Sequence, residues 1–390
     1  MFHTIITLAY TIPNIYVFLR VWQVFINRGY KLYYTLIYIL LAAVYPVSNL
    51  FSEGDISFLA AIFTMIGNYI LPFYLYLFLF VLVFDIFLLI NCLFKIIPAE
   101  KIRSTRFKKT GLSVILFFSV AVVVAGVINF NAIRISDYRI EIPGKSSEIN
   151  HLKIAFAADF HLKEGTNIHF VERFAKRIAI IRPDLLVLGG DIVEGDREDE
   201  NMAGFEKLFR EIDTRYGVFA VLGNHEYYAG QDKGSFFDKA GMKVLCDTIV
   251  VIDNSFNLGG RYDSHFRTRK TIGDLMKSVT DSLPVILIDH RPTEIDQVSK
   301  TAVDVQLSGH THDGQLFPIN LITRGVYQLS WGYRKTGNTH FFVTSGIRLW
   351  GPPVRTTGKS EIMVIDITLY RSISLAIYQC LATSPHKPIP

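Results

Sequence analysis

The first third of this chain is so apolar that it limits the possible folds more than any other feature. Half of the 390 residues are hydrophobic, and residues 1–132 consist mainly of Leu, Ile, Phe, Tyr and Val. The rest of the chain carries charges in every stretch, as ordinary water-soluble domains do. This change in composition predicts a membrane domain that ends near residue 132, followed by a second domain outside the bilayer.

Four segments are predicted to span the membrane, because a hydrocarbon core of roughly 30 Å needs about 20 apolar residues in a helix. They are residues 2–26, 32–51, 69–94 and 111–130. The third belongs to a longer apolar stretch, 56–94, and the part before residue 69 is interpreted as an interfacial or tilted extension. A hairpin of two short spans is the alternative. Residues 2–26 lack the basic region and cleavage site of a signal peptide, so we expect them to be retained.

Basic residues in the loops predict the orientation, because Lys and Arg near span ends stay in the cytoplasm. The first loop contains Arg28 and Lys31 and the third contains six basic residues, whereas residues 52–55 contain none. The chain is therefore expected to be an integral, multi-pass protein of the cell membrane. Four spans place its second domain outside the cytoplasm, and a hairpin over 56–94 would place it inside. Asp85, within the third span, is interpreted as structural because the sequence shows no second acidic partner nearby.

Charge and cysteine content exclude two classes of function. The formal net charge is +5, but the basic residues do not form a stripe interleaved with aromatic residues, so no nucleic-acid partner is expected. The three cysteines, at positions 92, 246 and 380, form no C-x-x-C pair. Neither a disulfide framework nor a zinc site built from thiolates is predicted.

From residue 152 onward, short apolar runs alternate with helix-like stretches, which is typical of a layered α/β domain. Five of these runs are followed at once by carboxylate, amide or imidazole side chains. The motifs are Asp159-Phe160-His161, Gly190-Asp191, Gly223-Asn224-His225-Glu226, Asp289-His290 and Gly309-His310-Thr311-His312. Because α/β sheets gather their sites at one edge, we expect these side chains to meet.

The residue types predict a site for two divalent cations. Cations about 3.5 to 4 Å apart need a carboxylate that bridges them, while imidazoles and an amide oxygen complete the coordination without excess charge. No cysteine takes part, so a thiolate site is excluded. Glycines 190, 223 and 309 beside these residues allow sharp turns and the close approach of a phosphate group.

In this order the motifs resemble the signature of the calcineurin-like metallophosphoesterases, over about residues 150–370. Gly314-Gln315 and Trp350-Gly351-Pro352-Pro353 are similar to the bacterial membrane-associated subfamily. The resemblance implies a four-layer αββα sandwich, in which two β-sheets pack face to face between helices. Together with the change in composition, it divides the chain into a transmembrane domain over 1–132, a linker over 133–149, a metallophosphoesterase domain over 150–375 and a C-terminal tail over 376–390.

The resemblance further implies a role for each site residue. One metal ion would be held by Asp159, His161, Asp191 and His312, and the other by Asp191, Asn224, His290 and His310. Asp191 would bridge the two ions, and a hydroxide that they share would attack phosphorus. His225 would protonate the leaving oxygen, since imidazole titrates near neutral pH. Manganese is the expected metal, with iron or zinc as alternatives.

The predicted function is that of a membrane-anchored, dinuclear-metal-dependent phosphoester hydrolase. We expect a phosphodiesterase or pyrophosphatase that acts on a lipid or lipid-linked substrate, with the lipid bilayer as its other partner. The alternatives are a broad phosphodiesterase for soluble substrates and a catalytically silent scaffold with the same fold. A silent relative should have lost a metal ligand or His225, and this sequence has lost none.

Three further positions near the motifs remain open to interpretation. Asp313 follows His312 where relatives often carry a small residue, so it could repel an anionic substrate or bind a third group. Asp196 is expected at most to contact a metal ligand, without binding the metal itself. His265 lies in the basic stretch 261–270, which is interpreted as a solvated loop, with the binding of a phosphate or head group as the alternative.

Overall fold

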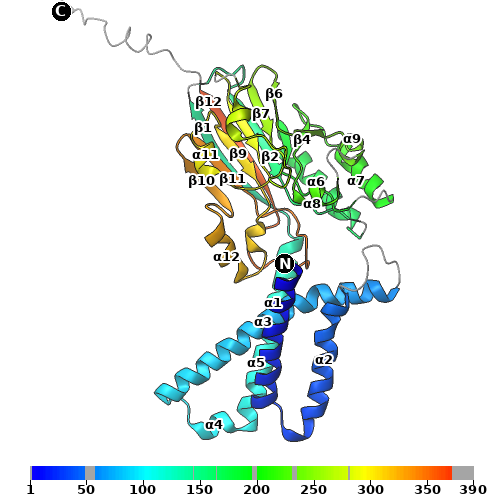
Figure 1. The fold of residues 1–390 in the computed structure, drawn as a ribbon, viewed down its shortest axis with the longest axis vertical. Coiled ribbons are helices and arrows are strands. Elements are labelled where there is room, and N and C mark those ends of the chain that lie inside the picture. The colour runs from blue at the N-terminus through cyan, green and yellow to red at the C-terminus, as the bar shows by residue number, and fades with distance from the viewer. Residues whose placement is uncertain are drawn as a thin grey trace, which may run out of the picture. The chain divides into compact units, whose positions relative to one another are not determined.

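The computed structural model describes residues 2–48, 58–143, 145–163, 165–195, 200–230, 235–279 and 282–370 (Figure 1). The chain divides into two compact units. The first unit comprises Met1–Ala132 with Trp350–Thr356, and the second comprises Ile133–Leu349 with Thr357–Pro390. The predicted C-terminal tail, 376–390, and Asp196 lie outside the described residues.

The first unit is helical. Its elements are α1 (Phe2–Val24), η1 (Arg28–Tyr30), α2 (Lys31–Ser48), α3 (Phe58–Phe94), α4 (Ala99–Arg103) and α5 (Thr105–Asn131). Among the described residues, three helical segments are long and apolar enough to cross a membrane: Arg28–Ser48, Phe58–Phe94 and Thr105–Asn131. The helix α1 is not one of these three, so the first of the four spans stays a prediction.

The helix α3 is continuous over 37 residues, through the Gly-Asn pair and the proline that interrupt its apolar sequence. At 1.5 Å per residue it is about 55 Å long, well beyond the roughly 30 Å of a hydrocarbon core. The structure therefore has no hairpin between residues 58 and 94. The residues before position 69 prolong the same helix, which agrees with their interpretation as an extension.

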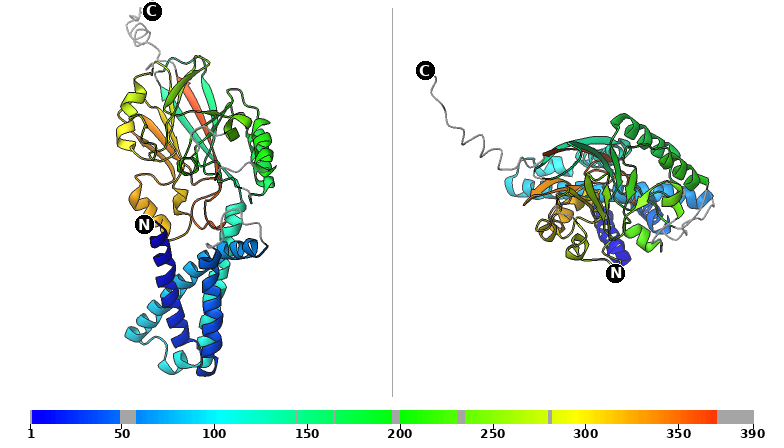
Figure 2. Two further views of the ribbon diagram at one scale, coloured as in Figure 1. Left: turned by 45° about the vertical axis from the view of Figure 1, so that its right-hand side comes forward. Right: turned by 90° about the horizontal axis from the view of Figure 1, so that it is seen from above.

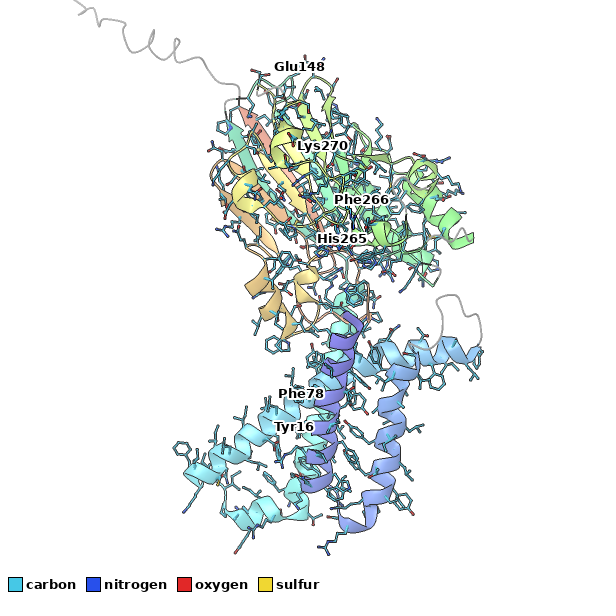
Figure 3. All side chains as sticks on the ribbon, viewed as in Figure 1. Tyr16, Phe78, Glu148, His265, Phe266 and Lys270 are labelled. Carbon is cyan, nitrogen blue, oxygen red and sulfur yellow. The ribbon has the colours of Figure 1, made fainter. Side chains whose placement is uncertain are left out.

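Asp85 of α3 has a cationic partner that the sequence analysis did not identify. Arg20 of α1 donates to it from Nη2 to Oδ1 over 2.5 Å and from Nε to Oδ2 over 2.7 Å. The hydroxyl of Tyr16 donates to the same carboxylate, and its ring packs edge-on against Phe78 with centroids 5.6 Å apart (Figure 3). A carboxylate in apolar surroundings is costly unless it is paired. The ion pair thus joins α1 to α3 and supports a structural role for Asp85.

The second unit contains two six-stranded sheets (Figures 1 and 2). The first has the order β1 (Arg134–Pro143), β12 (Glu361–Tyr370), β2 (His151–Ala157), β3 (Leu185–Leu188), β4 (Val218–Ala220), β5 (Lys243–Val244). The second has the order β10 (Gly332–Thr336), β11 (Thr339–Val343), β9 (Val305–Ser308), β8 (Val285–Ile288), β7 (Phe256–Gly260), β6 (Thr248–Ile252). The strands β2, β3 and β4 are parallel, as are β7, β8 and β9, so each set ends at one edge of its sheet.

The apolar side chains alternate between two cores, as the twofold period of a strand requires. In β2, Ile154 and Phe156 enter the cluster between the sheets, whereas Ala155 and Ala157 enter the cluster under the helices. The helices α6 (Ile168–Ile181), α7 (Glu200–Arg210) and α9 (Ser235–Lys239) cover the first sheet, and α10 (Ile272–Met276) and α11 (Ile295–Val298) cover the second. The predicted four-layer αββα sandwich is confirmed.

Residues 133–149 were expected to be a linker, but the structure has the edge strand β1 there. It runs parallel to β12 over ten residue pairs, from Arg134 with Glu361 to Pro143 with Tyr370. Ile140 and Ile142 are buried in the core between the sheets, while charged residues alternate with them along the strand. The high charge of the segment suggests a loop, but here it belongs to the exposed face of an edge strand.

Candidate metal centre

The side chains predicted to bind metal follow five parallel strands of the two sheets. Asp159 and His161 follow β2, Asp191 follows β3, Asn224 begins α8 (Asn224–Tyr228) after β4, His290 follows β8, and His310 and His312 follow β9. Six of these seven residues, all but Asn224, form three clusters together with His225, and in each cluster the candidate ligand atoms lie within 4.8 Å of one another. The clusters are Asp159 with His161 and His312, His161 with Asp191 and His225, and Asp191 with His290 and His310.

Several pairs of ligand atoms are as close as atoms that share one cation. Nε2 of His161 lies 3.3 Å from Nε2 of His312, and Nε2 of His290 lies 3.1 Å from Oδ2 of Asp191. Atoms that bind one cation at about 2.1 Å are roughly 3 Å apart. The backbone N–H of His225 donates to the other oxygen of Asp191 over 2.8 Å, which fixes the carboxylate in place.

Contacts behind the ring of His290 favour a tautomer that can bind a metal ion. Nδ1 of this residue lies 2.7 Å from the carbonyl oxygen of Gly189, which only accepts hydrogen bonds. The hydrogen is therefore on Nδ1, and Nε2, which faces Asp191, is the nitrogen that a metal ion would bind in place of a proton. A backbone carbonyl behind a ligating imidazole is the usual way in which proteins fix a metal-binding histidine.

The amide of Asn224 supplies an independent test of whether the residues fit a metal ion. Its Oδ1 atom is buried and has no hydrogen-bond partner among the described residues. A buried polar atom without a partner costs free energy, and native structures contain few of them. A divalent cation, which prefers oxygen and imidazole ligands, would satisfy this atom. The residues present therefore fit the predicted metal centre.

Burial and crowded charges shift the pKa values of the ligands. Burial raises the pKa of Asp159 to about 6, and the neighbouring Asp191 adds to this. Burial opposes protonation of His290, but the Asp191 carboxylate raises the pKa of this imidazole to about 10. Burial also lowers the pKa of His310 to about 3, with His290 adding to the effect. The site thus favours positive charge between its carboxylates, which bound cations would supply.

The backbone adopts uncommon conformations where it presents the ligands. Five ligand residues have positive φ angles: Asp159 at 60°, His161 at 47°, Asp191 at 51°, His310 at 71° and His312 at 50°. Residues other than glycine adopt this region rarely, and those that do gather at functional sites. The concentration of such angles in one place marks these turns as a functional site.

Two of the glycines that were predicted to admit a phosphate group are approached closely by the candidate ligands themselves. A Cβ atom on Gly223 would lie 2.2 Å from Oδ1 of Asp191, and one on Gly309 would lie 2.7 Å from Oδ2 of Asp159. Any side chain at either position would displace a ligand carboxylate. These glycines are therefore needed for the packing of the site.

Glu226, the last residue of the third motif, has a structural role that the sequence analysis did not assign. Its buried carboxylate accepts backbone N–H groups from Gly223 over 2.7 Å, Asp191 over 3.0 Å, Ile192 over 2.6 Å and Val193 over 3.1 Å. One side chain thereby ties the turn after β3 to the turn after β4. It fixes the positions of Asp191 and Asn224 relative to each other.

Glu194 is a site residue that the sequence analysis missed. Its Oε1 atom lies 2.9 Å from Nδ1 of His161 and 3.6 Å from Nδ1 of His225. It follows Asp191 by three residues, and this short spacing within one turn was the available signal. The sequence analysis considered only the more distant Asp196 as an acidic support.

Asp313 has partners within the fold that its sequence position did not indicate. Its carboxylate is buried and lies 3.3 Å from Nη2 of Arg324, in helix α12 (Ile319–Val326), and 3.4 Å from the hydroxyl of Ser330. Asp313 therefore serves to hold α12 beside the last motif.

The interpretation of 261–270 as a solvated loop is wrong for Arg261 and Arg269. Arg261 is fully buried and contacts Asp289 over 3.1 Å and Glu294 over 2.6 Å. Arg269 contacts the same buried Asp289 over 2.7 Å. Figure 3 labels His265, Phe266 and Lys270 in this stretch. Ion pairs with the buried Asp289 hold this segment against the second sheet.

The segment that carries the site also matches known proteins. Residues 152–314 match the family described as calcineurin-like phosphoesterase. An uncharacterized metallophosphoesterase of Aquifex aeolicus is 32% identical over 243 residues, which cover 60% of this chain and 92% of that protein. One from Helicobacter pylori is 33% identical over 223 residues, which cover 55% of this chain and 60% of that protein. A zebrafish (Danio rerio) protein described as a transmembrane protein with metallophosphoesterase domain is 26% identical over 281 residues, covering 67% of this chain and 63% of that protein.

Proposed function

Because this chain belongs to the calcineurin-like metallophosphoesterase family, we propose that it is a metal-dependent phosphoester hydrolase anchored to a membrane by its N-terminal helices. The observation that carries the proposal is the convergence of carboxylate and imidazole ligands from five strands into three clusters. The three apolar helical segments of the first unit support the anchor.

The ligand roles follow from how the clusters share residues. Asp191 and His161 each belong to two clusters, and of the two only the carboxylate of Asp191 has two oxygens with which to bridge two ions. Asn224 and His290 would complete the second set, on the basis of the unpartnered Oδ1 atom of Asn224 and the contact of His290 with Asp191. When bound, two divalent cations would lower the pKa of water and offset charge on the phosphoryl oxygens. We propose manganese as the natural metal, with iron and zinc as the alternatives that oxygen and imidazole ligands also accept.

His225 is proposed as the proton donor. Its backbone N–H is fixed on Asp191, its ring is partly accessible, and Glu194 lies behind Nδ1. Burial lowers the pKa of this imidazole, which makes its protonated form a stronger acid. In hydrolysis, a water oxygen bonds to phosphorus, the bond to the leaving oxygen breaks, and His225 gives that oxygen its proton.

We propose a lipid or lipid-linked phosphoester as the substrate. The helix α12 exposes Ile319, Ile322 and Val326, which are 42%, 68% and 70% exposed and lie on one face at positions i, i+3 and i+7. Such a face is typical of a helix that lies in the head-group region of a bilayer. Tyr327 directly follows α12, and its ring centroid lies 6.2 Å from that of His310. The C-terminal end of this helix thus lies next to the candidate metal centre.

The first test is hydrolysis of bis(p-nitrophenyl) phosphate by detergent-purified protein, with manganese or with a chelator. We expect metal-dependent turnover that Asp191→Asn abolishes and that His225→Ala lowers by about 10²- to 10⁴-fold. Asp274→Asn makes the same chemical change at an exposed carboxylate that belongs to none of the metal-ligand clusters. It is the matched control and should retain full activity. Turnover that survives both the chelator and Asp191→Asn would refute the proposal.

The lipid substrate needs a separate test, in which phospholipid and lipid-linked pyrophosphate in mixed micelles compete with the soluble diester. We expect a higher kcat/KM for a lipid, and we expect Ile322→Gln to lower only that value. If the soluble diester is cleaved as efficiently as every lipid, and Ile322→Gln changes neither, the protein is a broad phosphodiesterase for soluble esters.

We also propose that the second unit lies outside the cytoplasm, on the basis of the loop charges. A variant without native cysteines and with Lys207→Cys tests this, because the side chain of Lys207 is 77% exposed. A membrane-impermeant maleimide should label it in intact cells. Labelling only after lysis would place the unit in the cytoplasm.

A further inference from the structure

A second polar cluster adjoins the metal centre and has no part in the mechanism proposed above. The Arg291 cluster consists of Asp263, His265 and Arg291. Arg291 directly follows the ligand His290, and Tyr228, which contacts His265, lies one helical turn after His225. The cluster is thus attached at both ends to residues of the metal centre.

Asp263 organises the other two members. It is fully buried, and its Oδ2 atom accepts a hydrogen bond from Nε of Arg291 over 2.8 Å. Its Oδ1 atom accepts the backbone N–H of His265 over 3.0 Å and lies 2.7 Å from Nδ1 of the same imidazole. A carboxylate only accepts hydrogen bonds, so Nδ1 of His265 carries the hydrogen in this arrangement. The orientation of both side chains is fixed from behind.

Arg291 keeps donors that this arrangement does not use. Nη2 lies 3.0 Å from Nδ1 of His265, but that nitrogen already donates to Asp263 and cannot also accept. In the described part of the chain, neither terminal nitrogen of Arg291 therefore has an oxygen acceptor. The side chain is 18% exposed, so these N–H groups can be reached from solvent. A guanidinium that is fixed through Nε and presents its other donors is suited to binding anionic oxygens.

A simple counterion role would not explain this arrangement. The buried carboxylate of Asp263 receives one N–H from Arg291, together with two donors from His265. A lysine or a second histidine could neutralise Asp263 equally well. The planar fork of arginine adds the ability to hold two oxygens of one phosphoryl group.

Aromatic side chains connect the Arg291 cluster to the proposed proton donor. The ring of Tyr228 lies 6.1 Å from the ring of His225, and its hydroxyl lies 3.2 Å from Nε2 of His265. The ring of Tyr227 stacks on His265 with centroids 5.5 Å apart. Because His225 would protonate the leaving oxygen, these residues flank the position of the leaving group.

We propose that Arg291 binds a second phosphoryl group of the substrate, adjacent to the scissile one on the leaving-group side. The substrate class is then a pyrophosphate diester, in which the leaving group is itself a phosphate ester. This inference rests on the proposed function, because the side that the leaving group occupies is defined by His225.

The kinetic test compares two esters that differ by one phosphoryl group, bis(p-nitrophenyl) phosphate and P1,P2-bis(p-nitrophenyl) diphosphate. We expect Arg291→Gln to lower kcat/KM for the diphosphate by about 10- to 100-fold, as the loss of a charged hydrogen bond does, and for the monophosphate by less than about 3-fold. Arg267→Gln, at an exposed position of the same stretch, is the matched control and should change neither value. Equal losses on both esters, or no loss on either, would overturn the proposal.

A conservative variant separates binding from folding. Arg291→Lys keeps a positive charge beside Asp263 but lacks the planar fork, so we expect it to fold and to lose about 10-fold on the diphosphate alone. If Arg291→Gln unfolds, which thermal unfolding would reveal, this variant decides the question. Full diphosphate activity in Arg291→Lys would contradict bidentate binding.

A binding measurement keeps this inference separate from the proposed function. Calorimetry with methylenediphosphonate and methylphosphonate needs no turnover. We expect Arg291→Gln to weaken the diphosphonate by about 10-fold and the monophosphonate by less than about 3-fold. If the wild type hydrolyses neither ester, the proposed function fails, and this measurement still decides the subsite. Equal weakening of both phosphonates, or none, would refute it.

Discussion

Oε1 of Glu194 lies 2.9 Å from Nδ1 of His161, which places a partly buried carboxylate directly behind an imidazole of the candidate metal centre. The same oxygen lies 3.6 Å from Nδ1 of His225, and the two rings meet edge-on with centroids 4.7 Å apart. One side chain thus contacts both a proposed metal ligand and the proposed proton donor. Changes at Glu194 should affect metal binding and proton transfer together.

Glu194→Gln keeps the shape of the side chain but removes its charge. We expect manganese affinity to fall by about 10- to 100-fold, since contacts behind ligating histidines have effects of this size. Turnover at saturating manganese should also fall, because His225 loses its orientation. Titration with manganese measures the first effect and steady-state kinetics the second. Glu172→Gln, at a surface position, is the control, and an unchanged affinity would show that Glu194 is dispensable.

Glu226→Gln should destabilise the second unit. Each carboxylate oxygen of Glu226 accepts two backbone N–H groups, and an amide replaces one of these oxygens with a donor. Two buried N–H groups then lose their acceptor, at a cost of about 1 to 3 kcal/mol each. Thermal unfolding should show a lower melting temperature than for Glu211→Gln, whose side chain is 61% exposed. Equal melting temperatures would contradict this account.

Manganese should raise the melting temperature more at pH 7.5 than at pH 5. Burial raises the pKa of Asp159 to about 6, so a proton occupies this carboxyl in the metal-free protein at low pH. The proton must leave when a metal ion binds, and the apparent affinity therefore rises with pH. Scanning calorimetry with manganese and with a chelator at both pH values provides the measurement. An equal shift at both values would exclude competition with protons in this range.

His340 should make the stability of the second unit depend on pH. Burial lowers the pKa of this imidazole to about 4 in the folded state, with Lys335 adding to the effect, against an ordinary value of about 6.5. Between these values the unfolded chain binds a proton that the folded chain does not. The stabilisation is therefore complete above about pH 6.5 and is lost as the pH falls toward 4.

Denaturation at pH 4.5 and pH 7 measures this dependence. The side chain of His340 is buried and its Nδ1 atom lies 2.9 Å from the hydroxyl of Tyr333. His340→Gln should reduce the difference in stability between the two pH values, whereas His169→Gln, at a position 74% exposed, should not. An unchanged difference in His340→Gln would assign the pH dependence to other groups.

The ion pair between α1 and α3 predicts a non-additive double mutant. Arg20→Met leaves the Asp85 carboxylate without its cation in apolar surroundings, so it should lower the melting temperature in detergent. Adding Asp85→Leu removes the unpaired charge and should restore much of the loss. If the two substitutions are additive, the pair contributes nothing to the packing of the helices.

The convergence of the proposed metal ligands could be predicted because each one follows shortly after a buried strand. Asp159 and Asp191 come at the ends of β2 and β3, and parallel strands place such residues at one edge. The strand β1 could not be predicted in the same way, since half of its residues face solvent and the sequence pattern resembles a charged loop. Its partner is β12, more than 200 positions later, and local patterns carry no information on pairing over such distances.

The supporting residues were harder to predict than the ligands. Glu194 and Glu226 act through contacts with backbone N–H groups and imidazole rings that exist only in the folded chain. Arg20 lies 65 positions from Asp85, and the residues around each of them do not indicate that the two side chains form an ion pair. Acidic and basic residues of this kind do not belong to a recognisable strand pattern or sequence motif, so the sequence does not indicate their role. Their partners are determined by the tertiary fold.

The position of β12 between β1 and β2 has a consequence for how the protein is made. The ribosome synthesises β1 and β2 early, yet they do not pair with each other and each pairs instead with a strand that emerges last. The helices of the first unit are complete well before that point. The first sheet can therefore be completed around β1 and β2 only after residues 361–370 have been synthesised.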